Sequence, residues 1–328
     1  MLDVKVKIDL INPSGSLDWG YPLIVSKGDK EIAYTVCTSI DDVVKAGFAS
    51  ESDTYAAAAA MFRQNNPPAQ IAVCAFTDVT AEALATISDY DWRQLVTVGE
   101  VDTATVAAYV AATDDKMYFA GVASVGELKT LKGSAGSNRV VCVVHSTQAA
   151  LAAAAVAGEV AGRDVGSITY KNLALNGIEA ATFTEAEIAA IHEEYGITIV
   201  KKVGYVVTSE GYATSGEYAD ITDCTDYICS QIEYQTQQAL IANNKLPYDN
   251  RGISLLENIA LDVLKTAYDK GMIAEDAEGN PLYTVAYAPR EEMTANDIGS
   301  RKYTGGKFAF TLAGAIHNVE VTGEISVI

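Results

Sequence analysis

The regular alternation of short apolar runs with alanine-rich segments in the first half of the chain is the feature that most restricts its fold. The runs are rich in β-branched residues and lie at residues 32–36, 71–76, 95–98, 117–122 and 140–144. The segments between them with high helix propensity are residues 55–62, 81–87, 104–112 and 148–162. Thr80 and Thr103 precede two of these segments and are the expected N-caps. Strands that alternate with helices form parallel sheets covered on both faces, so we predict an α/β fold with a mostly parallel sheet and flanking helices.

The pattern changes after residue 165, where the strand-helix alternation gives way to longer elements. Residues 221–241 carry apolar side chains three or four apart, and residues 254–270 carry a second such stripe that ends before Gly271. A chain of 328 residues also exceeds the size at which a single core stops growing, so we expect a mixed α+β second domain on these two helices. The predicted division is an N-terminal strand arm and joint (1–22), an α/β middle domain (23–165), a C-terminal core domain (166–304) and a C-terminal strand arm (305–328).

Both ends of the chain alternate apolar and polar residues, which is typical of half-buried strands. The apolar positions of these terminal strands are Leu2, Val4, Val6, Ile8, Leu10, Phe308, Phe310, Leu312, Val319, Val321, Ile325 and Val327. Gly15, Gly305 and Gly306 are the expected flexible joints between the strands and the body. Edge strands on such tethers suit pairing with another chain, and pairing within the same subunit is the alternative.

The charge of the chain disfavours partners that are polyanions. There are 23 basic and 43 acidic side chains, which give a net charge of −20 at neutral pH. Nucleic acids and anionic lipid surfaces are therefore poor candidates. The first ten residues alternate charged with apolar side chains, unlike a secretory signal, and no apolar run is long enough to span a membrane, so we expect a protein made in the cytoplasm. An odd number of cysteines, five, favours buried and reduced thiols.

Few residues are arranged for chemistry. Residues 121–126 have two glycines at the spacing of a phosphate-binding loop, but Glu127 and Leu128 follow where Lys and Ser or Thr are required. The three histidines lie far apart, and no cysteine pair has the spacing of a metal site. We therefore expect no catalytic residue, metal or cofactor.

One group of residues still has the chemistry of an acid-base site. Asp78, Glu100, Asp102 and His145 all follow predicted strands, so they would gather at the carboxyl edge of the sheet. In so acidic a protein, a solvated rim is the competing interpretation.

Three segments resemble a known family. They are the small-residue segment at 153–164, the segment 211–252 in which Asp223 and Asp226 enter a long helix, and the segment 301–323 with Gly305-Gly-Lys-Phe-Ala-Phe. In this order and position they resemble the sheath proteins of contractile phage tails and of related phage-tail-like particles, including R-type bacteriocins. The resemblance covers residues 150–328 well and the first half only in its α/β character.

The resemblance implies a structural protein of a virion tail or phage-tail-like particle, assembled in the host cytoplasm. Its subunits would form six-fold rings around an inner tail tube, linked by exchanged terminal strands, and would contract to drive the tube through a cell envelope. Its partners would be copies of itself, the tube protein, and the baseplate and tail-terminator proteins, with no nucleic acid and no direct membrane insertion. Lys265 and Lys270, in the second predicted helix, are candidate contacts to the tube, and burial of this helix between the two domains is the alternative.

The main alternative belongs to another class. A soluble cytoplasmic α/β enzyme or small-ligand-binding protein would have its pocket at the strand ends, between the two halves of the chain. The two hypotheses differ in the assemblies that they predict, because a sheath forms long hollow tubes and an enzyme forms small discrete particles.

Overall fold

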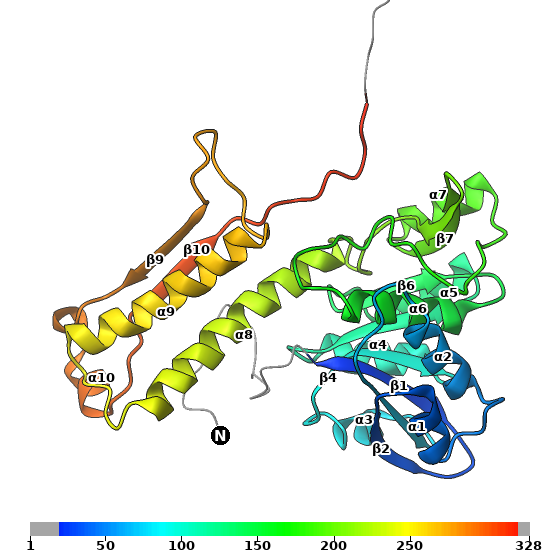
Figure 1. The fold of residues 1–328 in the computed structure, drawn as a ribbon, viewed down its shortest axis with the longest axis horizontal. Coiled ribbons are helices and arrows are strands. Elements are labelled where there is room, and N and C mark those ends of the chain that lie inside the picture. The colour runs from blue at the N-terminus through cyan, green and yellow to red at the C-terminus, as the bar shows by residue number, and fades with distance from the viewer. Residues whose placement is uncertain (1–19, 321–328) are drawn as a thin grey trace, which may run out of the picture.

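A computed structural model of the protein describes residues 20–320, in which a large α/β body carries a smaller, elongated lobe (Figure 1). The strands of the body are β1 (Tyr21–Lys27), β2 (Ile32–Cys37), β3 (Ile71–Phe76), β4 (Trp92–Val98), β5 (Met117–Val122), β6 (Val140–Val144), β7 (Ile197–Lys202) and β8 (Tyr205–Thr208). They form one eight-stranded sheet in the order β2-β3-β1-β4-β5-β6-β7-β8. In this order the inner strands, β3, β1, β4, β5, β6 and β7, are all parallel to one another. Only β2 and β8, at the two edges, run antiparallel to their neighbours. The predicted mostly parallel sheet is confirmed.

Helices cover both faces of this sheet. On one face lie α1 (Ile40–Lys45), α2 (Asp53–Phe62) and α6 (Ala149–Ala161), and on the other lie α3 (Ala81–Ala85), α4 (Thr103–Ala111), α5 (Val125–Ser134) and α7 (Glu185–Glu193). Helix α6 is buried from Ala152 to Val160 because it lies between the sheet and α2. Its small side chains permit this close packing: a Cβ on Gly158 would lie only 2.7 Å from the Cα of Met61.

Several local predictions for the body can be compared with the structure. Thr80 caps α3, since its hydroxyl accepts a hydrogen bond from the backbone of Ala83. The prediction for Thr103 was wrong: Asp102 is the N-cap of α4, because its carboxylate reaches the Ala104 amide at 3.1 Å. Residues 121–126 cover the end of β5, a two-residue turn and the start of α5.

The alternation also continues after residue 165, because α7 is followed by β7 and β8, which extend the same sheet.

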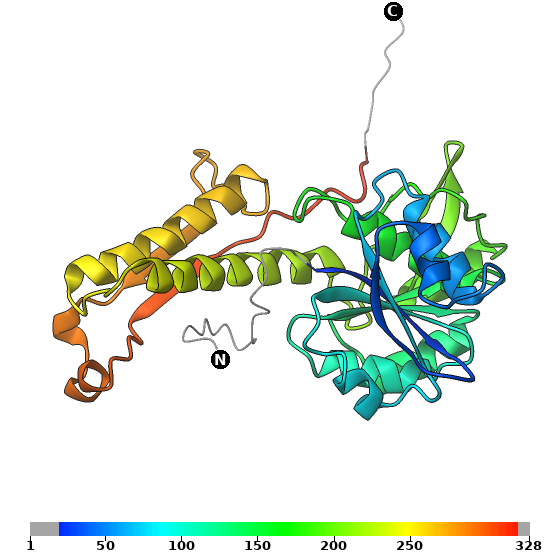
Figure 2. The same cartoon turned by 60° about the horizontal axis from the view of Figure 1, so that its bottom comes forward.

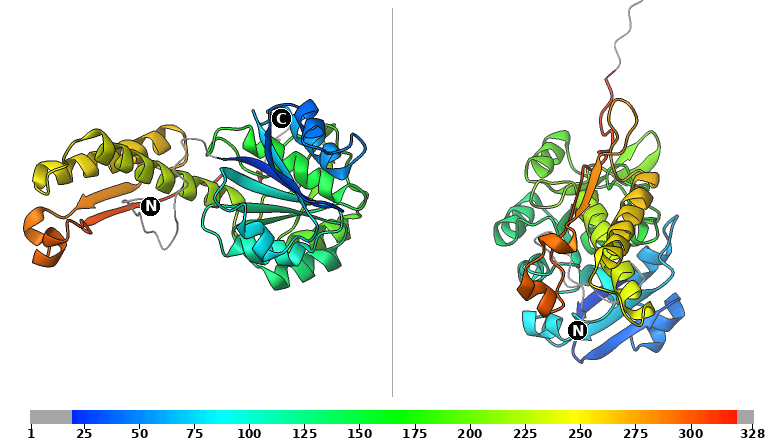
Figure 3. Two further views of the ribbon diagram at one scale, coloured as in Figure 1. Left: turned by 90° about the horizontal axis from the view of Figure 1, so that it is seen from below. Right: turned by 90° about the vertical axis from the view of Figure 1, so that its left-hand side faces the viewer.

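The elongated lobe is built on two antiparallel helices and a small sheet (Figures 2 and 3). Helix α8 (Ala219–Ala242) leads away from the body, and α9 (Asn250–Asp269) returns beside it. Strands β9 (Tyr283–Tyr287) and β10 (Gly306–Phe310) form an antiparallel pair that packs on α9, and the short helices η1 (Arg290–Glu292) and α10 (Ala295–Gly299) connect them. The two predicted helices are confirmed, and they share one core that includes Ile228, Ile232 and Leu264.

The cysteines agree with a further expectation. All five cysteines are buried and free. None of the helices between residues 20 and 320 is both long and apolar enough to cross a lipid bilayer.

Candidate functional site at the long helix and the C-terminal arm

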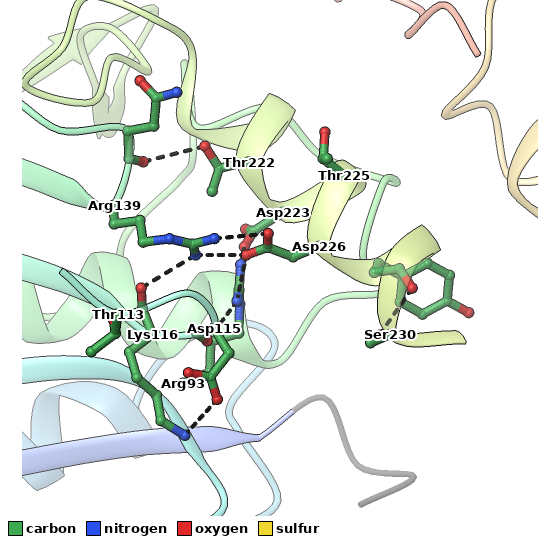
Figure 4. Close-up of polar contacts among 12 residues, drawn as sticks. Arg93, Thr113, Asp115, Lys116, Arg139, Thr222, Asp223, Thr225, Asp226 and Ser230 are labelled. Carbon is green, nitrogen blue, oxygen red and sulfur yellow. Dashed lines mark hydrogen bonds and ion pairs between the residues drawn. The ribbon is translucent and has the colours of Figure 1, made fainter. Parts of the chain in front are cut away.

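A buried cluster of ions joins the first turns of α8 to the body (Figure 4). Asp223 and Asp226 are three residues apart and therefore lie on one face of the helix. Arg93, in β4, places one guanidinium nitrogen 2.5 Å from Asp223 and another 2.9 Å from Asp226. Arg139, directly before β6, binds both carboxylate oxygens of Asp226 at 2.8 and 3.0 Å. The two arginines and two aspartates, here named the junction cluster, balance one another in charge.

Neutral groups complete the hydrogen bonding of the junction cluster. The hydroxyl of Tyr170 donates to the second oxygen of Asp223. Burial, and next the Asp223 carboxylate, raise the pKa of Tyr170 well above its usual value, so this hydroxyl stays protonated. Arg93 also donates to the backbone carbonyl of Asp115 at 2.8 Å. None of the four charged side chains is more than 9% exposed, and breaking such a buried pair is costly, so the cluster fixes α8 firmly to the sheet.

The strand order explains how this cluster forms. Strands β4, β5 and β6 are neighbours in the sheet. Arg93 is the second residue of β4, and Lys116 and Arg139 directly precede β5 and β6. This places a row of basic side chains along the amino edge of the sheet, under the start of α8. Sequence reasoning noted Asp223 and Asp226 but missed both arginines, although each stands at the start of an apolar run.

The small sheet of the elongated lobe has one covered face and one open face. Phe308 and Phe310 of β10 point toward α9, as do Tyr283, Val285 and Tyr287 of β9. The residues of the open face are Thr284, Ala286, Lys307 and Ala309, all exposed. Within residues 20–320, β9 and β10 pair only with each other, so each strand has one edge without a partner strand. Unpaired edges of this kind are templates for strands from another chain.

The two glycines before β10 are closely packed. A Cβ on Gly305 would lie 2.9 Å from atoms of Ala288, Met293 and Tyr303, and one on Gly306 would lie 2.8 Å from the ring of Tyr287. The backbone carbonyl of Gly305 also accepts a hydrogen bond from Ala288. Close approach is therefore a physical reason for glycine at both positions, whereas the sequence suggested flexibility.

After β10 the chain forms an extended arm that runs back along α8 toward the body (Figure 1). Leu312 bridges to Ile273, and from residue 313 to 320 every side chain is exposed except that of His317. The Nε2 atom of His317 lies 2.9 Å from the hydroxyl of Thr169, and its ring packs edge to face on Tyr218 with 4.6 Å between ring centres. His317 therefore anchors the arm to the body beside the first turn of α8.

The structure places only part of the predicted terminal strands. Val319 is 78% exposed. Leu2, Val4, Val6, Ile8, Leu10, Gly15, Val321, Ile325 and Val327 lie outside the described residues. Pairing of the arms between subunits stays a prediction.

Solved structures of known proteins match this chain over nearly its whole length. The contracted helical sheath of the anti-feeding prophage matches with a TM-score of 0.71 and 15% identity over 99% of this chain and 98% of that one. The chain has the fold of contractile sheath proteins. The contracted sheath complex of the extracellular contractile injection system PVC gives a TM-score of 0.69 at 14% identity over 100% and 98% of the two chains. A sheath tail protein from Desulfitobacterium hafniense gives 0.61 at 11% identity over 95% and 100%. No family model and no curated protein matches the sequence.

Of the two lysines predicted to contact a tube, Lys265 lies on α9 and Lys270 is the C-cap residue directly after it. Both are exposed, but they differ in their surroundings. The ammonium of Lys270 lies 3.1 Å from the hydroxyl of Tyr227 and 4.8 Å from the centre of its ring. Lys265 points to solvent from the same helix, so it is the better placed of the two to meet a partner.

The four residues considered for acid-base chemistry have separate structural surroundings. Asp78 pairs with Lys27 at 3.3 Å, and Asp102 caps α4. His145 is 1% exposed; its Nε2 lies 3.0 Å from the carbonyl of Glu179, and its Nδ1 accepts two backbone amides. Glu100 is exposed. The contacts of Asp102 and His145 hold backbone in place, and His145 is buried while Glu100 is exposed, so the four residues do not form one acid-base cluster.

Proposed function

We propose that this protein is the structural subunit of a contractile sheath that surrounds an inner tube. The observation that carries the proposal is the match to contracted sheath subunits, which covers body and elongated lobe together at a TM-score of 0.71. A shared α/β body alone would be weak support, because such bodies serve many functions. The elongated lobe, with its small sheet and open edges, has no evident use in a monomeric enzyme.

The small sheet supports the proposal that subunits are linked through exchanged strands. Strands β9 and β10 each offer one edge, and the two chain ends carry the alternating sequences expected of strands. An arm that adds to each edge would turn two strands into four and would satisfy the backbone groups of both edges. Rings of six subunits, stacked around the tube, would then stay connected while the bodies move during contraction.

The work of contraction would come from contacts between subunits. An extended array held in a metastable state can relax to a more stable contracted one without a nucleotide or other cofactor. The proposed partners are copies of this chain, the inner tube protein, and the baseplate and tail-terminator proteins of the same particle.

The proposed sheath function is tested by negative-stain electron microscopy of the purified full chain. Long hollow tubes are expected. Discrete small particles over a wide range of protein and salt concentrations would contradict the proposal and favour the enzyme or ligand-binding alternative.

Strand exchange is tested by removing residues 2–11. The truncated protein is expected to melt cooperatively near the wild-type temperature and to form no tubes, because the described cores keep their buried faces. Val6→Pro removes a ladder donor and should act similarly, whereas Val6→Thr keeps the β-branched shape and is the matched control. A sharp fall in melting temperature after truncation would show that the N-terminal strand pairs within its own subunit.

Contact with the tube is tested at α9. Lys265→Glu should weaken attachment of the sheath to the tube, more strongly at low salt, and leave sheath-sheath contacts unchanged. Lys270→Glu is the comparison, since Lys270 is engaged with Tyr227 in its own subunit. Normal attachment by the double variant would remove α9 from consideration.

A further inference from the structure

The hairpin between β7 and β8 has an unusual turn. Lys202 and Tyr205 are the last paired residues, so Val203 and Gly204 alone form the loop. Both have positive φ angles, 48° and 89°. Glycine adopts this conformation freely, but a β-branched side chain does so at a cost, and Asn or Asp is the usual residue at the first position of such a loop. The subunit therefore carries local strain at Val203.

Nothing within the described part of the subunit compensates for this strain. Val203 is 97% exposed and Tyr205 is 68% exposed, so two large apolar side chains lie in solvent at one tip. A Cβ built on Gly204 would meet no atom within 4 Å. Backbone strain that the fold does not need is concentrated at functional sites, and the two apolar side chains beside it are free to contact a partner.

Side chains, and not unpaired backbone groups, are what the hairpin exposes for contact. The outer edge of β8 is already covered, since Leu175 donates to Val206 and Thr208 donates to Leu173. An added strand is therefore excluded there.

The charge at the hairpin also contrasts with the rest of the body. Lys202 is held by the side chain of Asn172 at 2.9 Å, and Lys201 is exposed beside it. Acidic side chains outnumber basic ones by about two to one in residues 20–218, which make up the body, so the hairpin is a basic tip on an acidic body.

We propose that the hairpin tip, formed by Lys201, Val203 and Tyr205, docks on the acidic body of a second copy of this chain. The complementary charge is the argument for this occupant, since every copy presents an acidic surface to its neighbours. The tip lies at the end of the body away from α9 (Figure 1). A contact between this tip and a different surface of the next copy is heterologous, so it generates rings or helical arrays. The inference rests on the proposed sheath function for its context and adds a contact that is independent of the terminal arms.

Val203→Asn is the decisive variant because it separates strain from docking. Asparagine adopts the left-handed conformation more easily, so the subunit should melt at the wild-type temperature or above it. Loss of the apolar contact should nevertheless raise the lowest protein concentration at which tubes form by about tenfold. If Val203 served only the fold, Val203→Asn would change the melting temperature and leave the concentration needed for tube formation unchanged.

Lys201→Glu tests the charge. It should also raise the concentration needed for tube formation, and the effect should shrink as salt is added. Lys30→Glu, in the exposed turn between β1 and β2, makes the same charge change at another site and is the control. Wild-type assembly by both Val203→Asn and Lys201→Glu would overturn the proposal.

A wild-type protein that forms no tubes would refute the sheath function, and docking would then be measured by sedimentation velocity. Self-association of the wild type that Val203→Asn abolishes would support docking between copies. A wild-type chain that stays monomeric at high concentration, or associates as well with Asn at position 203, would overturn it.

Discussion

Replacement of Arg139 by Met should destabilise the subunit because it leaves a carboxylate buried with too few partners. Asp226 is 5% exposed and has three short contacts to guanidinium nitrogens in the junction cluster, two of them from Arg139. Loss of one partner from a buried ion pair costs about 3–5 kcal/mol. Arg93 stays 2.9 Å from Asp226, so we expect the lower end, about 3 kcal/mol.

Urea denaturation followed by circular dichroism measures this effect. With a slope near the upper end for small proteins, about 3 kcal/mol per molar urea, the midpoint should fall by about 1 M. Arg251→Met is the matched control: Arg251 lies 2.7 Å from Asp249, but its side chain is 87% exposed, so its loss should leave the urea midpoint nearly unchanged. An equally unchanged midpoint for Arg139→Met would refute the reasoning.

A second variant separates the cost of an unpaired charge from the loss of packing. In Arg139→Met combined with Asp226→Leu, the uncompensated carboxylate is gone, and Arg93 keeps Asp223. Replacement of buried ion pairs by apolar groups is often neutral or favourable, so the double variant should be more stable than Arg139→Met alone. A double variant that is less stable would show that Asp226 contributes chiefly through Arg93.

Three further outcomes are expected. His317→Ala should release the C-terminal arm, so a spin label at residue 319 should move faster. The melting temperature should stay within about 2 °C, because the arm covers little apolar surface. Unchanged motion of the spin label would show that His317 does not anchor the arm. Gly121→Ala should destabilise strongly in urea, since its Cβ would lie 2.4 Å from the carbonyl oxygen of Ala149, whereas Gly133→Ala, with no atom within 4 Å, should gain up to about 1 kcal/mol. Burial raises the pKa of Cys74 to about 12 and also raises that of Cys142, so native protein at pH 8 should resist a thiol reagent that labels the protein in urea; fast labelling without urea would contradict the buried state.

The body could be predicted from the sequence because its signals are local. Buried parallel strands are continuous apolar runs, and β3, β5 and β6 begin and end where those runs do. The choice between Thr103 and Asp102 as N-cap could not be settled in this way, since both are capping residues and only the backbone geometry decides which one reaches a free amide. The hairpin at residues 197–208 had a visible signal in Val203-Gly204 between two apolar runs, but it falls where the change of pattern suggested a separate domain.

The contacts of the junction cluster could not be predicted from the sequence. An isolated Arg at the start of an apolar run looks like a boundary residue, and only the order of β4, β5 and β6 in the sheet brings Arg93 and Arg139 to the same carboxylates. Asp223 is 130 residues from Arg93 in the chain, so no periodic pattern connects them. Of the predicted terminal strands, β10 was correctly placed, but its partner β9 was missed because its five residues carry no distinctive motif.

The long helix has a mechanical consequence. Its 24 residues rise about 1.5 Å each, which makes α8 a lever of about 36 Å from the body to the far end of the lobe. A rotation of the body by about 10° would therefore carry the far end through about 6 Å, more than the spacing of two strands in a sheet. Because the ion pairs of the junction cluster hold the first turns of α8 on the body, α8 should rotate with the body and bend little where the two meet. In the proposed sheath, small adjustments between neighbouring bodies would thus become displacements large enough to change which strand edges can meet.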